Sequence, residues 1–367
     1  MRNVILVATG LLTALAASSA APLEAPAISL AAPVPQERGP VNRSDFTPAA
    51  REAVDRALAW LASRQNANGS WTNRVGYKLY EDYFGEENDS IDVTAIAGMA
   101  FVSAGHVPGR GKYGKNVALG VQWLLSKVRD EDGYITHAGS RMYSHAFATM
   151  FLAEVYGTTP RADLRVKLKR AVNLIVSAQN HEGGWRYQPI PVDADLSVTV
   201  STLQALRAAR NTGIAVPMET INRATAYVKR CARSSGFSYQ AATDYTMNDT
   251  RVSYPLSACG VVALYSAGEY DSREIRSGLA YLSRSSRLRA GRYHYFYGHY
   301  YASQAMYLSE LKHQGGFRDY YTRVRDEILE RRDKDGGWTD DVGRTYATAM
   351  AIIVLQMPCE LLPLFQK

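Results

Sequence analysis

Residues 56–71 read RALAWLASRQNANGSW, an apolar helical stretch that runs into a turn ending in glycine and an aromatic residue. Residues 170–185, RAVNLIVSAQNHEGGW, repeat that order. Looser copies bring the aromatic anchors to six: Trp71, Tyr134, Trp185, Phe237, Tyr293 and Trp338. Their numbering gives steps from 45 residues (293 to 338) to 63 residues (71 to 134). Periods in this range indicate stacked units, none of which can bury its apolar face alone.

Each repeat is predicted to hold two helices. The first precedes the turn and carries charges along one face, as in 52–64, 117–128 and 164–178. The second has almost no charge on any side, which predicts burial all round; these helices are 93–104, 146–156, 197–209, 256–267, 302–311 and 346–355. Because no polar end caps are evident, the sequence predicts an all-α fold closed into a double ring of about six helix pairs, an α/α toroid over residues 45–367.

The N-terminus has the layout of an export signal. Residues 1–20 combine one basic residue, an apolar run and small residues at their end, which is typical of a cleaved signal peptide; an uncleaved anchor is the alternative. Residues 21–44 are rich in alanine and proline and are predicted to be a flexible linker. We therefore expect an exported protein, periplasmic or extracellular, whose mature chain has no transmembrane span.

Composition argues against a nucleic-acid partner. The chain is 46% hydrophobic and 21% charged with a net charge of +7, but its basic residues are scattered, and the cluster 165–170 fits the solvated face of an outer helix. Of three cysteines, Cys231 and Cys259 are predicted to lie in adjacent helices, where export would permit a disulfide. Buried free thiols are the alternative.

The Gln-x3-Gly-x-Trp pattern of 65–71 and 179–185 resembles the QW motif of squalene and terpenoid cyclases. The helix pairs are similar to that family's α/α toroid, which protein prenyltransferase β subunits share. The resemblance covers residues ~50–357 and implies that Gln65, Trp71, Gln179 and Trp185 brace the outer helices. It implies the fold more than the activity, because one toroid hosts several chemistries.

The starts of the inner helices are the candidate site. All inner helices are predicted to begin at one end of the ring, so the residues there should converge at one mouth. Helix capping explains aspartates at such positions but not Tyr, His or Arg. The residues are Asn88, Asp89, Asp92, Arg141, Tyr143, His145, Asp193, Asp195, Asp249, Arg251, Tyr254, His294, Tyr297, His299, Tyr300, Tyr301, Asp340, Asp341, Arg344 and Tyr346.

The expected occupant of this mouth is an isoprenoid or other lipid, a polar ligand, or a protein partner. Twenty-four tyrosines against nine phenylalanines favour a polar ligand, because phenol hydroxyls suit a wet site better than a hydrocarbon one.

Asp193 and Asp195 are the catalytic candidates. Class II terpene cyclases protonate an alkene with an Asp-x-Asp-Asp motif, and Asp193-Ala194-Asp195 is similar to its first three positions. The resemblance implies that Asp195 is the proton donor, which requires a carboxyl with a raised pKa. Leu196 replaces the third carboxylate, and the chain has one toroid where such a cyclase is expected to have two.

A zinc prenyltransferase is the other enzyme hypothesis. His299 lies in a Tyr-Gly-His-Tyr-Tyr segment that resembles the family's zinc-ligand segment, but the partner Asp-x-Cys element is absent, so no metal or cofactor is predicted. The sequence favours a ligand- or partner-binding toroid, or a divergent enzyme without an intact cyclase motif. The alternative is a cyclase-like enzyme, an isomerase or transferase acting on an isoprenoid through Asp195.

Overall fold

A computed structural model describes residues 43–75, 85–241, 251–285, 294–312 and 316–362. The predicted signal peptide, nearly all of the predicted linker, the anchor Tyr293 and the candidate Asp249 lie outside these residues. The described part is mostly helical and holds twelve α helices. A two-stranded antiparallel hairpin, β1 (Trp71–Val75) and β2 (Glu86–Ser90), joins the first two of them, with Trp71 opposite Ser90.

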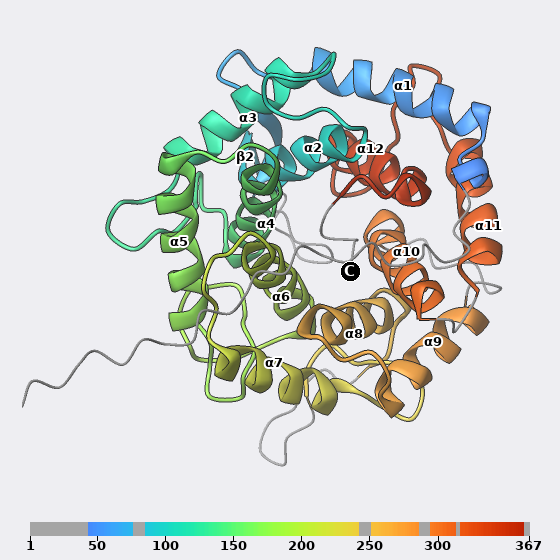
Figure 1. Ribbon diagram of the computed structural model, residues 1–367. Coiled ribbons are helices and arrows are strands. Elements are labelled where there is room, and N and C mark those ends of the chain that lie inside the picture. The colour runs from blue at the N-terminus through green and yellow to red at the C-terminus, as the bar shows by residue number, and fades with distance from the viewer. Residues whose placement is uncertain (1–42, 76–84, 242–250, 286–293, 313–315, 363–367) are drawn as a thin grey trace, which may run out of the picture. The chain divides into compact units, whose positions relative to one another are not determined.

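The even-numbered helices form an inner ring (Figure 1). They are α2 (Ile91–Ser103), α4 (Met142–Thr158), α6 (Leu196–Asn211), α8 (Tyr254–Ala267), α10 (Tyr295–Leu311) and α12 (Arg344–Leu355). Each contacts the next, and α12 contacts α2, which closes the ring.

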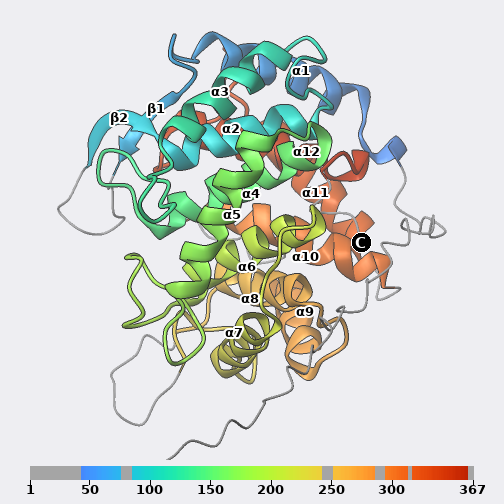
Figure 2. The ribbon, with the colours of Figure 1, turned by 60° about the vertical axis from the view of Figure 1, so that its left-hand side comes forward.

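The odd-numbered helices cover the inner ring from outside, as Figures 1 and 2 show. They are α1 (Pro48–Ser63), α3 (Gly114–Ser126), α5 (Ala162–Ser177), α7 (Met218–Cys231), α9 (Arg273–Ser285) and α11 (Phe317–Glu330). Because α1 contacts α2, α11 and α12, the last repeat packs on the first. The predicted closed α/α toroid is confirmed.

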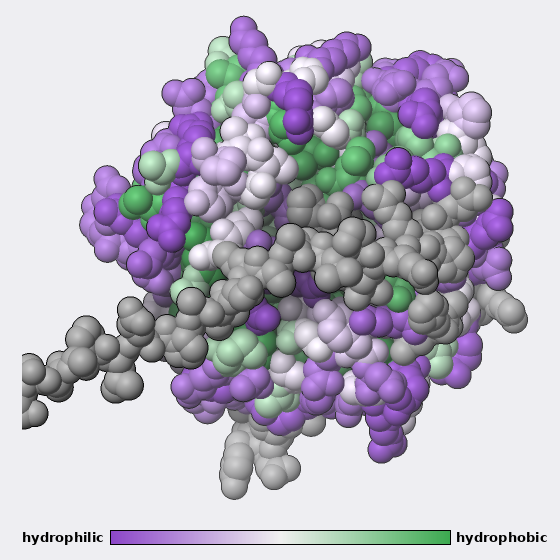
Figure 3. All heavy atoms as spheres, in the orientation of Figure 1, coloured by the Kyte–Doolittle hydropathy of each residue, from purple (hydrophilic) through white to green (hydrophobic). Residues whose placement is uncertain are grey.

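Burial follows the charge pattern of the sequence. In α2 every residue except Asp92 is buried, whereas α5 buries one stripe that includes Leu164, Leu168 and Ile175. Each such aliphatic side chain contributes roughly 2 kcal/mol when it leaves water. Hydrophilic residues gather along the periphery of the face in Figure 3, where the outer helices lie.

The anchor tryptophans join the two helices of a repeat. The indole Nε1 of Trp71, Trp185 and Trp338 donates to a carbonyl ten residues earlier in the outer helix, at 2.9, 2.7 and 2.7 Å. Their backbone N–H groups donate to inner-helix hydroxyls, those of Thr94, Thr199 and Thr348. Each turn is therefore held to its outer helix by the side chain and to its inner helix by the backbone.

The turn glutamines join neighbouring repeats. Gln65 Nε2 donates to Gly69 O and to Asn116 O in α3, both at 2.9 Å. Gln179 Nε2 donates to Gly183 O at 2.8 Å and to Thr220 O in α7 at 2.9 Å. Both side chains therefore tie a Gly-aromatic turn to the next outer helix.

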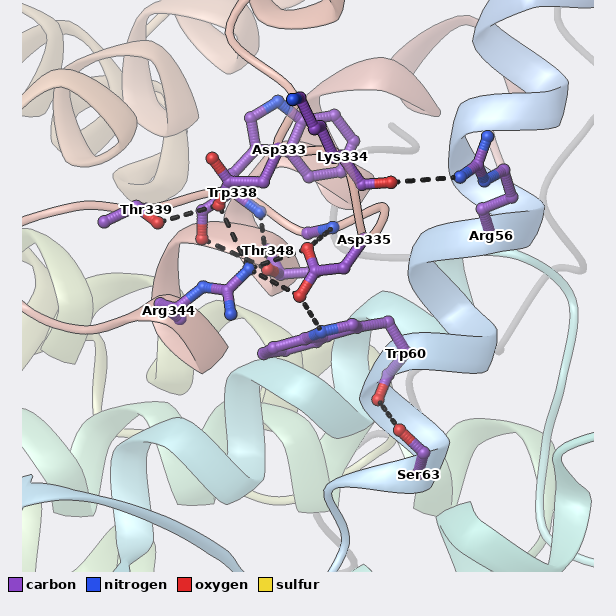
Figure 4. Close-up of polar contacts among 11 residues, drawn as sticks. Arg56, Trp60, Ser63, Asp333, Lys334, Asp335, Trp338, Thr339, Arg344 and Thr348 are labelled. Atoms are coloured by element: carbon purple, nitrogen blue, oxygen red, sulfur yellow. Dashed lines mark hydrogen bonds and ion pairs between the residues drawn. The ribbon is translucent and has the colours of Figure 1, made fainter.

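Figure 4 shows where the ring closes, at contacts of α1 with the segment 333–348, which we call the seam. Trp60 Nε1 donates to Asp335 Oδ2 at 3.1 Å, and Arg56 Nη2 donates to Lys334 O at 3.3 Å. Arg344 Nη2 lies 2.7 Å from Asp335 Oδ1, and its guanidinium stacks 5.0 Å from the Trp60 ring.

The cysteines are free thiols, so of the two alternatives left open for Cys231 and Cys259 the structure shows the buried free thiols and not the disulfide. Cys231 lies beside Tyr227 in the outer helix α7, whereas Cys259 contacts Tyr297 within the inner ring. The two thiols are therefore buried in separate places, where each packs as a small side chain. In the described residues, none of the helices has the length and hydrophobicity to cross a bilayer.

Candidate functional site at the mouth of the ring

The inner helices begin earlier than predicted, by two residues in α2 and by seven in α10 (295 against 302). Ten of the twenty candidates therefore lie within helices and not in loops before them. Since successive helical residues point about 100° apart, neighbours in sequence face different ways. The structure divides the candidates into a central group, a rim group, and residues that face other elements.

The central group, which we call the mouth cluster, is Asp92, Tyr143, Asp195, Cys259, Tyr297, Tyr300, Tyr301 and Tyr346. Tyr143 OH donates to Tyr297 OH at 2.5 Å, and the Cys259 thiol donates to the same oxygen at 3.3 Å. Tyr143 belongs to α4 and Tyr297 to α10, which lie on opposite sides of the inner ring (Figure 1). Side chains thus cross the ring at its axis.

A second bridge between inner helices lies about two turns further along α10. Gln204 Nε2 in α6 donates to Gln304 Oε1 in α10 at 2.5 Å, and both side chains are buried. Phe147 in α4 packs 6.2 Å from the Tyr300 ring. At these two levels the described side chains meet across the axis.

The phenols of the mouth cluster are neutral at physiological pH. Burial raises the pKa of Tyr143, Tyr297, Tyr301 and Tyr346 well above the usual range. Burial also raises the pKa of the Cys259 thiol, so Cys259 is not a thiolate nucleophile. The Tyr301 hydroxyl is buried and makes no hydrogen bond within the described residues.

Asp195 caps α6 and is fully buried. Its Oδ1 accepts from Val198 N at 2.8 Å and from Ser197 Oγ at 2.6 Å. Its Oδ2 has no hydrogen bond within the described chain, and Arg186 Nε lies 3.9 Å away. Burial raises the pKa of this carboxyl, against the opposing effects of Ser197, Val198, Arg186 and Tyr239.

A second group, the rim cluster, lies beside Asp195: Arg141, Arg186, Tyr187, Asp193 and Tyr239. Arg186 Nη1 pairs with Asp193 Oδ2 at 2.5 Å. The guanidiniums of Arg186 and Arg141 lie 5.4 and 5.8 Å from the Tyr187 ring, whose hydroxyl is 2.6 Å from that of Tyr239. Asp193, half-exposed and paired outward, does not form a carboxyl pair with Asp195.

Two of the three candidate histidines, His145 and His299, lie between the rings and not at the mouth, whereas His294 packs 6.1 Å from the Tyr297 ring. His145 accepts from Ile135 N at 3.0 Å through Nδ1, and its Nε2 lies 3.1 Å from Ala171 O. His299 Nδ1 lies 2.9 Å from Tyr320 OH in α11, and Tyr254 packs against the same imidazole. Burial lowers the pKa of His145 to about 4 and that of His299 to about 3.

Three further candidates lie outside the two clusters. Arg344 belongs to the seam, the carbonyl of exposed Asp341 accepts from Arg74 Nη2 at 2.7 Å, and Arg251 is exposed before α8. Asp92 Oδ1 accepts from Val93 N at 3.0 Å within α2, but its charge still acts on Tyr346.

Sequence reasoning missed Cys259, Arg186, Tyr187 and Tyr239 as members of the two clusters. Tyr187 and Tyr239 lie two residues after the anchors Trp185 and Phe237, and their carbonyls accept from Met142 N and Leu196 N, the first residues of α4 and α6. The position two residues after these two anchors was the available signal, because it docks the turn on the preceding inner helix.

Metal ligands are not gathered in the described residues: no group of three His, Cys, Asp or Glu side chains lies close enough to hold an ion. His299, which resembles a zinc ligand in sequence, instead uses Nδ1 in its contact with Tyr320.

Comparisons with known proteins agree with this architecture. Residues 43–159 match the model of the squalene-hopene cyclase C-terminal domain. The chain is similar in structure to a cellobiose 2-epimerase from Bacillus thermoamylovorans (TM-score 0.61, 13% identity, 84% of this chain and 98% of that one). It is also similar to a GH76 alpha-mannanase from Bacteroides thetaiotaomicron (TM-score 0.62, 9% identity, 84% and 95%).

A third similar structure is the type II terpene cyclase MstE from Scytonema, in complex with geranylgeranyl dihydroxybenzoate (TM-score 0.56, 14% identity, 87% of this chain and 99% of that one). One toroid therefore covers this terpene cyclase almost completely, so the expectation that such a cyclase has two toroids was wrong. No protein of curated function matches. At these identities the similarities show the toroid fold and not a particular activity.

Proposed function

We propose that this protein is a toroid that binds a polyhydroxylated, carbohydrate-type ligand at its mouth. One observation carries the proposal: the Tyr301 hydroxyl and Asp195 Oδ2 are buried without hydrogen bonds in the described residues. Each such group costs roughly 1–3 kcal/mol if nothing pairs with it. Sugar hydroxyls can donate and accept at these positions, whereas a hydrocarbon would leave both atoms unpaired.

Two further features support a polar ligand. The bridges Tyr143–Tyr297 and Gln204–Gln304 cross the axis where an extended polyprene would have to lie. Similar toroids include a cellobiose 2-epimerase and an alpha-mannanase, whose names refer to sugars. The proposal includes export through the N-terminal signal-like segment, to a compartment where glycans are exposed.

The test is isothermal titration calorimetry of the full chain with cellobiose and mannobiose. We expect saturable binding that Tyr301→Phe weakens about fivefold or more, since the variant removes one hydroxyl partner and little volume. Tyr227→Phe is the matched control, because Tyr227 is equally buried but lies in the outer helix α7. Binding of neither sugar, or equal effects of the two variants, would contradict the proposal.

A cyclase-like enzyme is the second candidate, favoured by the raised pKa of the buried Asp195 carboxyl. It predicts conversion of geranylgeranyl dihydroxybenzoate, the compound in the MstE complex, and loss of conversion in Asp195→Asn. The Asn side chain keeps the helix cap and removes only the proton. Turnover of this compound by the wild type would replace the carbohydrate proposal.

A further inference from the structure

Arg141 differs from the other charged residues of the rim cluster because no carboxylate of the described residues pairs with it. Arg186 pairs with Asp193 at 2.5 Å and has Asp195 at 3.9 Å. Arg141 is half-buried, yet among the described residues its side chain has one recorded contact, the stack at 5.8 Å on Tyr187. A guanidinium offers five donors in a planar fork, and here the fork has no acceptor.

The backbone holds Arg141 firmly on both sides. Before it, the Ser140 carbonyl accepts from Thr136 Oγ1 at 2.9 Å, and Ser140 Oγ accepts from His137 N at 3.1 Å. After it, Met142 N donates to Tyr187 O at 2.9 Å. Ala138 in this turn has φ +49°, a left-handed conformation that is unfavourable for alanine. The unpaired guanidinium is therefore presented from a fixed backbone.

We propose that Arg141 is the binding residue for an oxyanion carried by the ligand, so that the mouth prefers acidic sugars, carboxylated or sulfated, over neutral ones. This inference rests on the proposed function for the sugar and adds the charge. Arg141 is two residues from Tyr143 of the mouth cluster, so a sugar whose hydroxyls pair with that cluster would carry its acidic group to the rim. A guanidinium binds carboxylate with two parallel hydrogen bonds, which fixes orientation as well as adding affinity.

The neighbouring guanidinium supports the same choice. Arg186 and Arg141 both stack on the Tyr187 ring. Asp193 and Asp195 both face Arg186, so neither of these carboxylates pairs with Arg141 in the described residues. An anionic group on the ligand would give Arg141 the partner that Arg186 already has.

The test is calorimetric titration of the full chain with three matched trimers: cellotriose, its C6-carboxylated form and its sulfated form. We expect the wild type to bind at least one acidic trimer about tenfold more tightly than cellotriose at low salt, and Arg141→Gln to abolish that difference. Arg141→Lys keeps the charge but not the fork and should retain only part of the preference. The two acidic arms distinguish a carboxylate site from a sulfate site.

Arg161→Gln is the matched control. Arg161 also occupies an N-cap position without a side-chain capping bond, but it begins the outer helix α5, after the C-terminal end of α4, and pairs with Asp163. It should keep the full preference for acidic trimers. No preference in the wild type, or a preference that survives in Arg141→Gln, would overturn the inference.

A second measurement separates this inference from the proposed function. In ¹⁵N NMR spectra the Arg141 Nε–H signal, assigned by its absence in Arg141→Gln, is followed during titration with sodium glucuronate and sodium sulfate. If the anions shift the signal saturably but the protein binds no neutral sugar, the oxyanion site is supported and the carbohydrate proposal is refuted. If no anion shifts that signal, the oxyanion site is refuted, whatever the neutral sugars do.

Discussion

At the scale of single residues, His145 occupies a place that hydroxyl residues occupy in other repeats. Thr94, Thr199 and Thr348 each accept a hydrogen bond from the anchor of their turn, and His145 accepts one from Ile135, the residue after the anchor Tyr134. All lie in the first turns of inner helices. His145 is therefore a structural acceptor, and its titration should affect stability.

We expect His145→Gln to make the protein less sensitive to acid. Burial lowers the pKa of His145 to about 4, while an unfolded histidine has a pKa of about 6.5. The unfolded chain therefore takes up the proton first, so stability is lost as pH falls from about 6.5 to about 4, by roughly 3 kcal/mol in all. Glutamine can keep both contacts, to Ile135 N and Ala171 O, but does not titrate in this range.

Urea unfolding followed by circular dichroism at pH 7.5, 6 and 5 measures this difference. The free energy of unfolding of the wild type should fall by about 2 kcal/mol more than that of the variant between pH 7.5 and 5. His181→Gln, at an exposed histidine before Trp185, should behave as the wild type. Parallel pH curves for wild type and His145→Gln would refute the structural role.

The two catalytic candidates show which features of the site the sequence pattern can predict and which it cannot. Sequence identified Asp195 as an inner-helix start residue, and the structure adds that its carboxyl is buried with a raised pKa. Its resemblance-implied partner, Asp193, is paired with Arg186 instead. That pairing could not be predicted because Arg186 follows the anchor Trp185, a position that the repeat pattern marks only as turn.

At the scale of elements, helix positions were predictable and helix starts were not. Charge-free stretches predicted all six inner helices, but they did not predict that α10 begins at Tyr295. Its Tyr-rich first turns lack an apolar periodicity, and His294 provides no capping side chain that would mark the start. A start that is wrong by several residues changes which face each side chain occupies. This is why His299 and Tyr254 were expected at the mouth and instead pack toward α11.

The turn glycines offer a prediction about how elements pack. Gly183 has φ +97°, and a Cβ there would lie 2.2 Å from Arg223 O in α7. Gly213 has φ +81° with nothing within 4 Å of its Cβ position. We expect Gly213→Ala to cost about 1–2 kcal/mol through backbone strain alone, and Gly183→Ala about 3 kcal/mol or more because α7 must also shift.

Thermal and urea unfolding of the two variants check this difference. Both substitutions add one methyl group at a left-handed glycine, so the backbone strain is the same in both variants. The difference between their losses of stability therefore measures the contact between the turn and α7. Equal losses of stability would show that the close approach of the turn to α7 contributes nothing.

At the scale of the whole ring, closure depends on residues that are far apart in sequence. Trp60 Nε1 in α1 donates to Asp335 Oδ2 at 3.1 Å, the Arg344 guanidinium stacks 5.0 Å from the Trp60 ring, and α1 also contacts α11 and α12. Repeat proteins are stabilised mainly by contacts between neighbouring repeats, so a ring has one more such interface than an open stack. Loss of the seam should loosen both of its sides together.

We therefore expect Trp60→Ala to lower hydrogen-exchange protection in α1 and in 333–348 by about 2 kcal/mol, through loss of the indole hydrogen bond and the cation–π contact. Protection of α6 and α7, across the ring, should not change. Trp123→Ala is the matched control: Trp123 precedes its anchor Tyr134 by the same eleven residues as Trp60 precedes Trp71, and it stacks with Lys127 at 5.3 Å. Its loss should affect the second repeat and leave 333–348 protected. If Trp60→Ala loosened α1 alone, the seam would be a local contact, and the ring would be closed by the apolar packing of α12 against α1 and α2 instead.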